Sequence, residues 1–280
     1  MRKSRAADPA TSFSFFCCTT INIDAGALTG RDGSGKLQID ETRYPHGLRW
    51  LSDRLHAMDF KFGVYTDISG KTCGNGPGTG SLGHYDLDAH TFAHEWQADY
   101  LKVDFCGPAG FAPNCANASD PRCISIDPEP QYAAWAALRD ALNRTGRPIY
   151  FSICPHAASD RKGTGAPFNL IYAPPLAWNK AQRRDLANSL LVEYDNTMDS
   201  WADFTDAKGY HHWGVLSNID SQIHSSRLQD TGPSSWNDAD MLQVCNYGEG
   251  YTPGGGMSLS EYRVHYTVWA ILYLGIAVCL

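Results

Sequence analysis

The segment Asp99–Gly107 contains a lysine and an aspartate two residues apart within a run of β-forming residues. The run is too short for a helix and typical of a strand, so Lys102 and Asp104 point to the same strand face. This pair would be costly in an apolar core but suits a strand that opens into a polar pocket. There the lysine keeps the aspartate ionised, as a carboxylate nucleophile requires. The alternative is a structural Lys-Asp pair at a strand end.

Composition limits the classes of protein to which the chain can belong. Its 280 residues are enough for one barrel-type domain or two small domains. A formal net charge of −7 and the lack of a basic run argue against a nucleic-acid partner. The thirteen largely apolar residues 268–280 are too few to span a membrane, so we expect no membrane partner. We expect them to form a buried helix and strand that stop before their natural end.

The cysteines indicate the compartment. The chain has nine, and Cys115 and Cys123 flank an N-glycosylation sequon at residues 117–119; a second sequon occupies residues 143–145. Cysteine pairs beside sequons favour an oxidising compartment, and we therefore predict an extracellular, secreted protein. The alternative is a cytosolic chain with free thiols. The cysteine spacings match no zinc site, so no metal is expected.

The sequence alternates between strand-like and helix-like segments. Strand-like runs occur at Thr20–Asp24, Lys61–Asp67, Tyr100–Cys106, Pro148–Cys154 and Leu190–Asp195. Apolar residues at helical spacing occur at Pro45–Met58, Asp86–Gln97 and Gln131–Asn143, and Gly146 is placed to end the last helix. This alternation predicts an α/β fold made of βα units around a parallel sheet.

Carboxylates recur where the predicted strands end. Asp24, Asp67, Asp104 and Asp195 all stand at the C-terminal ends of such strands. In a parallel barrel that face holds the active site. Helix capping could explain one such carboxylate, but four in a row favour a functional site.

A series of motifs follows in order along the chain. It comprises Asn22-Ile23-Asp24, Arg31-Asp32-Gly33, Tyr44-Pro45-His46-Gly47, Gly63–Asp67, Thr72-Cys73-Gly74, Tyr100–Asp104, Ala141–Ile149 and Trp236–Leu242. Together these resemble glycoside hydrolase family 27, the melibiase or α-galactosidase family. The resemblance implies a (β/α)8 TIM barrel followed by a small β-sandwich. It also implies hydrolysis of terminal α-D-galactosyl residues with retention, on an α-galactoside carbohydrate substrate, without a metal or cofactor.

The resemblance also suggests how the chain is divided. Residues 21–280 are expected to form the catalytic barrel, and residues 1–20 an atypical N-terminal segment. The family's first strand and its C-terminal β-sandwich have no counterpart here, so we expect an incomplete barrel.

Roles follow from the resemblance, residue by residue. Asp104 matches the family nucleophile. The substrate-binding positions are matched by Lys102 beside the nucleophile, Asp24 on the galactose hydroxyls, Tyr65 in the pocket, and Asp240 with Met241 on the pocket wall. Cys73 and Cys106 match the cysteines of a disulfide beside the pocket. From the residues alone, Tyr65 could equally be barrel packing.

The acid/base position is matched by Asp195. The family has an arginine four residues before its acid/base, and here Leu191 stands at that place. One residue is also inserted before Trp201. Asp199 or Glu193 therefore stay open as alternative proton carriers.

Departures from the family pattern leave other functions open. Ala25 replaces the second of two adjacent aspartates, and Pro155-His156 replaces an acidic residue that recognises the sugar. These changes suit a related glycosidase acting on α-N-acetylgalactosaminides or β-L-arabinopyranosides, or a catalytically impaired sugar-binding barrel. Lys102 could also be the Schiff-base lysine of an aldolase. Such a lysine must lack a close carboxylate, so the neighbouring Asp104 argues against this function.

Overall fold

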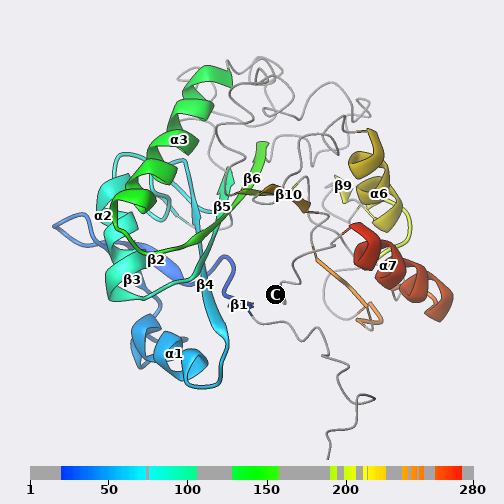
Figure 1. Ribbon diagram of the computed structural model, residues 1–280, viewed down its shortest axis with the longest axis horizontal. Helices are drawn as coiled ribbons and strands as arrows, with labels where there is room; N and C mark the ends of the chain where they lie inside the picture. Colours follow the sequence, from blue (N-terminus) through cyan, green and yellow to red (C-terminus); the bar gives the residue numbers. More distant parts are fainter. Residues whose placement is uncertain are drawn as a thin grey trace, which may run out of the picture.

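Parallel strands form the main sheet of the molecule. The computed structural model describes residues 20–73, 76–105, 128–157, 190–193, 199–205, 211–212, 214–224, 235–238, 241–244, 246–248 and 256–272. Within these residues the sheet contains, side by side, β1 (Thr20–Asn22), β4 (Lys61–Asp67), β5 (Tyr100–Phe105), β6 (Tyr150–Ala157), β7 (Leu190–Glu193) and β10 (Ser235–Asp238). Their spatial order follows the chain, so successive crossovers advance in one direction, as in a β/α barrel (Figure 1).

Helices and short hairpins lie between these strands or follow them in the part of the chain that the structure describes. The helices are α1 (Gly47–His56), α2 (Tyr85–His90) with the π-helical turn η1 (Thr91–Glu95), α3 (Pro128–Arg144), α6 (Val215–His224) and α7 (Leu259–Leu272). The hairpins pair β2 (Leu28–Arg31) with β3 (Leu37–Ile39), and β8 (Phe204–Thr205) with β9 (His211–His212). No helix in the described ranges is both long and apolar enough to cross a bilayer.

The predicted alternation of strands and helices is confirmed, with shifts at the ends of elements. β1 stops at Asn22, so Asp24 lies beyond the strand, just before a turn at residues 25 and 26. β6 begins at Tyr150 rather than Pro148, because proline has no N–H to give a neighbouring strand. The helix expected over 86–97 is α2 and η1, where Trp96 donates to the carbonyl of Thr91, five residues back.

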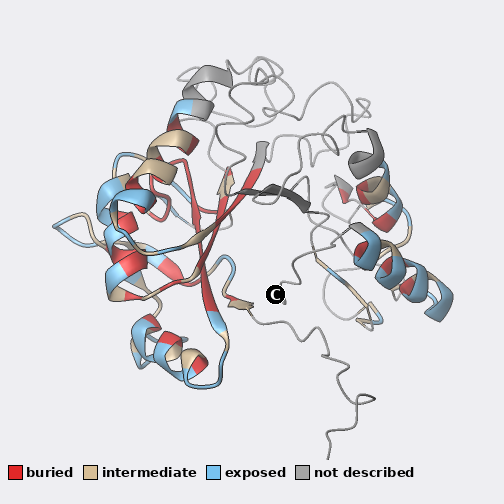
Figure 2. Cartoon of the chain, viewed as in Figure 1, coloured by how far each residue is buried: buried red, intermediate tan, exposed pale blue. Residues whose placement is uncertain are grey.

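The two faces of the sheet differ in chemistry. The apolar residues of β4 and β5 (Phe62, Val64, Leu101, Val103) join one hydrophobic cluster with helix side chains that include Leu48, Phe92, Trp135 and Leu138. Each fully buried side chain of this kind contributes roughly 1.5–3 kcal/mol. Figure 2 shows β4 and β5 buried along most of their length, whereas the helices are buried on one side. Alternate residues of a strand point to opposite faces, so the polar residues of β4 and β5 (Tyr65, Asp67, Lys102 and Asp104) lie on the face away from the helices.

A partly buried ionic network joins the N-terminal ends of the strands. Asp99, just before β5, accepts hydrogen bonds from the Phe62 amide at 2.9 Å and from Arg147 at 2.8 Å, and lies 2.6 Å from His56 Nε2. Burial raises the pKa of Asp99, but these bonds outweigh it and hold the pKa below its usual value. The network links α1, β4, β5 and the start of β6 at the end of the barrel that serves stability.

A buried ion pair fixes the first hairpin. Arg31 on β2 makes a two-pronged salt bridge to Asp88 of α2, at 2.7 and 2.6 Å. The same guanidinium donates to the carbonyl of Gly80 at 2.8 Å. Both side chains are almost fully buried. Arg31 therefore anchors the hairpin onto the loop between β4 and α2, which carries Cys73.

Candidate functional site

Neighbouring strand ends bring the polar side chains together. The register pairs Tyr65 with Lys102 and Asp67 with Asp104, and it pairs Lys102 with Ser152 of β6. These residues therefore stand in two successive layers on the face opposite the helices, with Asp67 and Asp104 nearest the C-terminal edge. The single face predicted for Lys102 and Asp104 is confirmed.

Asp104 lies at the end of β5 and is held by hydrogen bonds to both of its oxygens. Its Oδ2 accepts the hydroxyl proton of Tyr65 at 2.7 Å, and its Oδ1 accepts its neighbour's amide, Phe105 N–H, at 2.8 Å. Both donors stabilise the negative form of the carboxylate and fix its orientation. Asp104 is half-buried, which leaves it accessible from the strand ends.

Tyr65 acts only as a hydrogen-bond donor at this position. Its side chain is 4% exposed. Burial raises the pKa of the Tyr65 phenol far above its usual value, and the negative charges of Asp104 and Asp67 add to the shift. The phenol thus stays protonated at any working pH. The packing interpretation of Tyr65 is incomplete, since its hydroxyl is engaged with the predicted nucleophile.

Lys102 reaches the other predicted binding carboxylate. Its Nζ lies 3.3 Å from Asp24 Oδ2. The lysine side chain is 5% exposed, whereas that of Asp24 is 46% exposed. The buried ammonium thus holds an accessible carboxylate at the mouth of the site. Asp24 Oδ1 also accepts the amide of Ala25 at 2.6 Å, so both of its oxygens are oriented.

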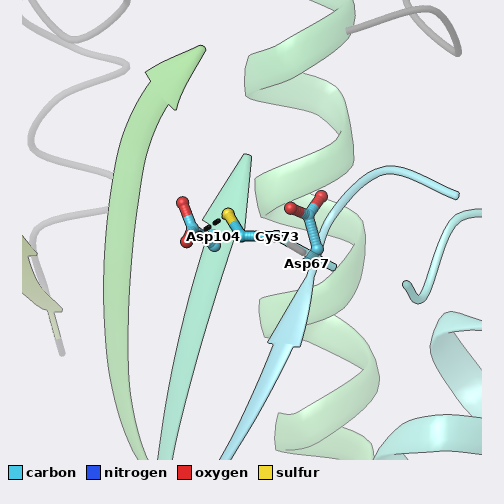
Figure 3. Close-up of side chains that lie close together, drawn as sticks. All are labelled: Asp67, Cys73 and Asp104. Atoms are coloured by element: carbon cyan, nitrogen blue, oxygen red, sulfur yellow. Dashed lines mark hydrogen bonds between the residues drawn. The ribbon is translucent and has the colours of Figure 1, made fainter. Parts of the chain in front are cut away.

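Asp67, Cys73 and Asp104 form a compact group (Figure 3). One ligand atom from each, two carboxylate oxygens and a sulfur, all lie within 4.8 Å of one another. Cys73 Sγ is 2.9 Å from Asp104 Oδ2. Cys73 is disulfide-bonded, and its partner lies outside the described residues, as does Cys106. The sulfur therefore carries no proton to donate, and in this state it is not a thiolate ligand for a metal.

The predicted residues from the later strands are described only in part. Asp195, Asp240 and the side chain of Glu193 lie outside the described residues. Met241 is half-buried, with its sulfur 3.8 Å from Gln243 Nε2. The structure thus brings together Asp24, Tyr65, Lys102, Cys73 and Asp104.

Asp199, an alternative proton carrier, has a different environment. It is buried, and its two oxygens accept the Tyr262 hydroxyl at 2.8 Å and the Gly248 amide at 2.5 Å. Tyr262 belongs to α7, and its oxygen in turn accepts the amides of Tyr247 and Met257. Asp199 therefore connects α7 to the loop that follows β10.

Sequence reasoning placed Asp67 among the strand-end carboxylates without a specific role, and it gave no role to Tyr262 or Asp99. Asp67 carried a signal, because it ends its strand as Asp104 does. Tyr262 carried none, because its helical spacing from His265 and Trp269 looks like ordinary core packing. Asp99 immediately precedes the motif that predicted β5, and no sequence pattern indicated its contacts with His56 and Arg147.

Comparison with known proteins places this geometry in a family. The family model described as alpha galactosidase A (Melibiase_2) matches residues 16–277. A human alpha-N-acetylgalactosaminidase is 34% identical over 256 residues, covering 91% of this chain and 50% of that protein. An alpha-galactosidase of Lachancea cidri is 31% identical over 254 residues, covering 90% and 46%.

The fold agrees with solved structures of the same group. The structure of an alpha-galactosidase from Saccharomyces cerevisiae with raffinose superposes with a TM-score of 0.67 at 25% identity, covering 93% of this chain and 50% of that one. The chain spans about half the length of the curated relatives it matches. Its parallel sheet is that of the TIM-barrel half of these proteins. The chain belongs to the melibiase family of glycoside hydrolases, the α-galactosidase family.

Proposed function

We propose that this protein is a retaining α-galactosidase that removes terminal α-D-galactosyl residues from oligosaccharides or glycoconjugates. The observation that carries the proposal is the position of the Asp104 carboxylate. It accepts a hydrogen bond from Tyr65 at the strand ends, and Lys102, two residues before it on β5, pairs with Asp24. This arrangement supplies a fixed, ionised nucleophile next to groups that bind sugar hydroxyls. The relative of known structure named with raffinose supports an α-galactoside substrate.

The first chemical step is the formation of a galactosyl-enzyme. Asp104 Oδ attacks the anomeric carbon as the bond from that carbon to the aglycone oxygen breaks. Asp195 gives its proton to the departing oxygen. In the second step Asp195 takes a proton from water, and the resulting hydroxide displaces Asp104. Retaining enzymes place these two carboxyl groups about 5–5.5 Å apart.

We assign the acid/base to Asp195 rather than Asp199. Asp199 is buried, and both its oxygens already accept hydrogen bonds from Tyr262 and Gly248. A proton carrier must instead reach the leaving group and then water. Glu193 stays as a second alternative at the end of β7.

The sugar is bound by the remaining residues of the predicted set. Asp24 accepts hydrogen bonds from galactose hydroxyls, and Lys102 donates to them while holding Asp24 in place. Asp240 and Met241 close the far wall of the pocket. The disulfide of Cys73 is proposed to join Cys106, and it supports an oxidising, extracellular location.

A second candidate activity is hydrolysis of α-N-acetylgalactosaminides. Similarity to the human alpha-N-acetylgalactosaminidase favours it as strongly as the galactosidase relatives favour the first. The two substrates differ only at the second carbon of the sugar. The side chains that contact the substituent on this carbon therefore determine which of the two substrates is preferred.

A paired substrate assay tests the proposal. The purified chain is offered p-nitrophenyl α-D-galactopyranoside and the matching α-N-acetylgalactosaminide, with Asp104→Asn as the control. Release of nitrophenol from the galactoside that disappears in the variant supports the proposal. A preference for the acetamido sugar selects the second activity. A folded chain that cleaves neither indicates an impaired sugar-binding barrel.

Azide separates the acid/base candidates. With an activated aryl galactoside, azide replaces water without needing a general base, so it rescues a variant that lacks the acid/base. Rescue is expected for Asp195→Ala and not for Asp199→Ala. The reverse pattern would move the role to Asp199.

A further inference from the structure

Two buried side chains hold the segment between β10 and α7 in place. The hydroxyl oxygen of Tyr262 accepts the amide of Tyr247 at 2.7 Å and the amide of Met257 at 3.3 Å. The same hydroxyl donates to Asp199 at 2.8 Å, and the other oxygen of Asp199 accepts the amide of Gly248 at 2.5 Å. Three amides of the segment are thus bound by Tyr262 and Asp199, both of which are buried.

The same face of α7 carries a buried histidine. His265 is wholly buried, and neither of its ring nitrogens has a hydrogen-bond partner among the residues that the structure describes. It shares one helix face with Tyr262 and Trp269, and its ring lies 4.1 Å from that of Trp269, centroid to centroid. Tyr262 and Trp269 belong to a hydrophobic cluster with Met257 of the segment. This apolar place suits the neutral ring and not the charged one.

The surroundings of His265 provide little compensation for a positive charge. Burial lowers the pKa of His265 to about 4, although the negative charge of Asp199 acts in the opposite direction. Tyr262 stays neutral, since burial raises the pKa of its phenol. The other charged residues of α6 and α7 whose side chains the structure describes are not buried: Asp220, Glu261 and Arg263. A charged ring therefore has to be stabilised by water.

We propose that His265 is a pH-sensitive switch, and that protonation of its ring releases the segment between β10 and α7 from Tyr262 and Asp199. Water reaches this helix face when Met257 and the rest of its segment leave it, and the charged ring favours that open form. The neutral ring favours the closed form, so the segment closes again when the pH rises. The main sheet stays folded, because β4 and β5 belong to a separate hydrophobic cluster.

The expected size of the effect follows from the two states of the histidine. The closed form binds the proton with a pKa of about 4, whereas an exposed ring has a pKa of 6.5. The closed form is therefore fully favoured above pH 6.5 and loses this advantage as the pH falls towards 4. Between pH 7 and pH 5 the ratio of open to closed molecules is expected to rise about 20-fold.

Release of the segment also affects the proposed pocket. Met241, which is expected on the pocket wall, belongs to the same segment. Substrate binding is therefore expected to weaken in acid. This consequence rests on the proposed function, whereas the release does not, so an inactive protein still gives an answer in the experiment below.

Amide hydrogen exchange tests the release without using activity. Exchange of the whole chain is followed at pH 7 and pH 5, and each rate is corrected for the intrinsic exchange rate at that pH. The amides of Tyr247, Gly248 and Met257 are expected to open about 20-fold more often at pH 5. Their protection should be lower than that of the β4 amides at both pH values, and nearly independent of low urea concentrations. Unchanged opening at pH 5, or protection equal to that of β4, would overturn the proposal.

Matched variants assign the effect to the histidine. His265→Phe keeps a ring against Trp269 but binds no proton, so its segment is expected to open equally at both pH values. His46→Phe changes an exposed histidine and is expected to keep the rise of the wild type. Tyr262→Phe removes the hydroxyl that holds the segment, and its segment is expected to be open already at pH 7. The proposal is overturned by a rise in His265→Phe equal to that of the wild type, or by full protection in Tyr262→Phe.

Discussion

At the scale of single residues, the site depends on how each carboxylate is held. Asp104 receives hydrogen bonds from Tyr65 and from the Phe105 amide that favour its negative form. Asp24, by contrast, is exposed and is oriented by a buried lysine. Asp199 is buried within a hydrogen-bonded network and serves to join segments. Three aspartates of one sequence thus have three different environments, because their neighbours differ.

Removing the Tyr65 hydroxyl tests whether it supports the proposed nucleophile, Asp104. Tyr65→Phe keeps the ring that packs in the site but removes the donor at 2.7 Å from Asp104. A hydrogen bond to a charged group contributes about 1.5–3 kcal/mol, so kcat/KM is expected to fall by about 10- to 100-fold. Steady-state kinetics on an aryl α-galactoside measure it, and thermal melting confirms the fold. Unchanged kcat/KM would show that Tyr65 is packing only.

The burial of His265 leads us to expect that the stability of the fold depends on pH. It is fully buried on α7, its two ring nitrogens have no hydrogen-bond partner among the described residues, and its ring packs on Trp269. Burial lowers the pKa of His265 to about 4, although the negative charge of Asp199 works in the opposite direction. The unfolded chain binds the proton near pH 6.5. Stability contributed by the neutral ring is therefore complete above that pH and is lost as the pH falls towards 4.

The corresponding experiment is a series of thermal melts between pH 7 and pH 4. The wild type is expected to lose on the order of 2–3 kcal/mol of unfolding free energy over this range through His265. His265→Phe should flatten the slope. His46→Phe, which changes an exposed histidine, should not. A slope that persists in His265→Phe would refute the assignment.

At the scale of elements, loops are positioned by side chains that lie far from them in the sequence. Tyr262 on α7 accepts the amides of Tyr247 and Met257, both in the segment between β10 and α7, and donates to Asp199. Arg31 on β2 holds the loop that carries Cys73. The residues near the proposed chemistry are thus fixed by elements that carry none of it.

Two glycines with the same backbone conformation allow the cost of backbone strain to be separated from the cost of a steric clash. Gly256 and Gly83 have φ of 81° and 79°, and a side chain at either position is strained. A Cβ at Gly256 would lie 2.7 Å from Asp199 Oδ2 and closer still to Gly248 N, whereas at Gly83 nothing lies within 4 Å. Gly83→Ala should cost about 1 kcal/mol, and Gly256→Ala about 1–3 kcal/mol more. Chemical denaturation of both variants measures the difference, and equal costs would contradict the described packing around Asp199.

The elements that the sequence predicted best are those with strong local patterns. β4 carries a continuous apolar run with a carboxylate at its end, and its predicted bounds match those observed. β2 and β3 were not predicted, because each is short and their pairing depends on the turn at Asp32, whose carboxylate accepts the Ser34 and Lys36 amides. The Asp199–Tyr262 contact joins residues 63 positions apart, so no local pattern reveals it.

At the scale of the whole molecule, the proposed site and the ionic network of Asp99 lie at opposite ends of the sheet. The Asp99 network joins the N-terminal ends of the strands, while Asp24, Tyr65, Lys102 and Asp104 gather toward the C-terminal ends. A barrel built in this way can change its pocket without changing its base. Family membership agrees with this division, since the motifs that reveal the family include the strand ends.

Direct labelling of the nucleophile is the sharpest test of this account. A 5-fluoro-α-galactosyl fluoride should form a long-lived glycosyl-enzyme, because the ring fluorine slows its hydrolysis more than its formation. Mass spectrometry of the digested chain is predicted to find one galactosyl adduct, on Asp104, and none in Asp104→Asn. An adduct on another carboxylate, or none on a folded chain that cleaves α-galactosides, would contradict the assignment of Asp104.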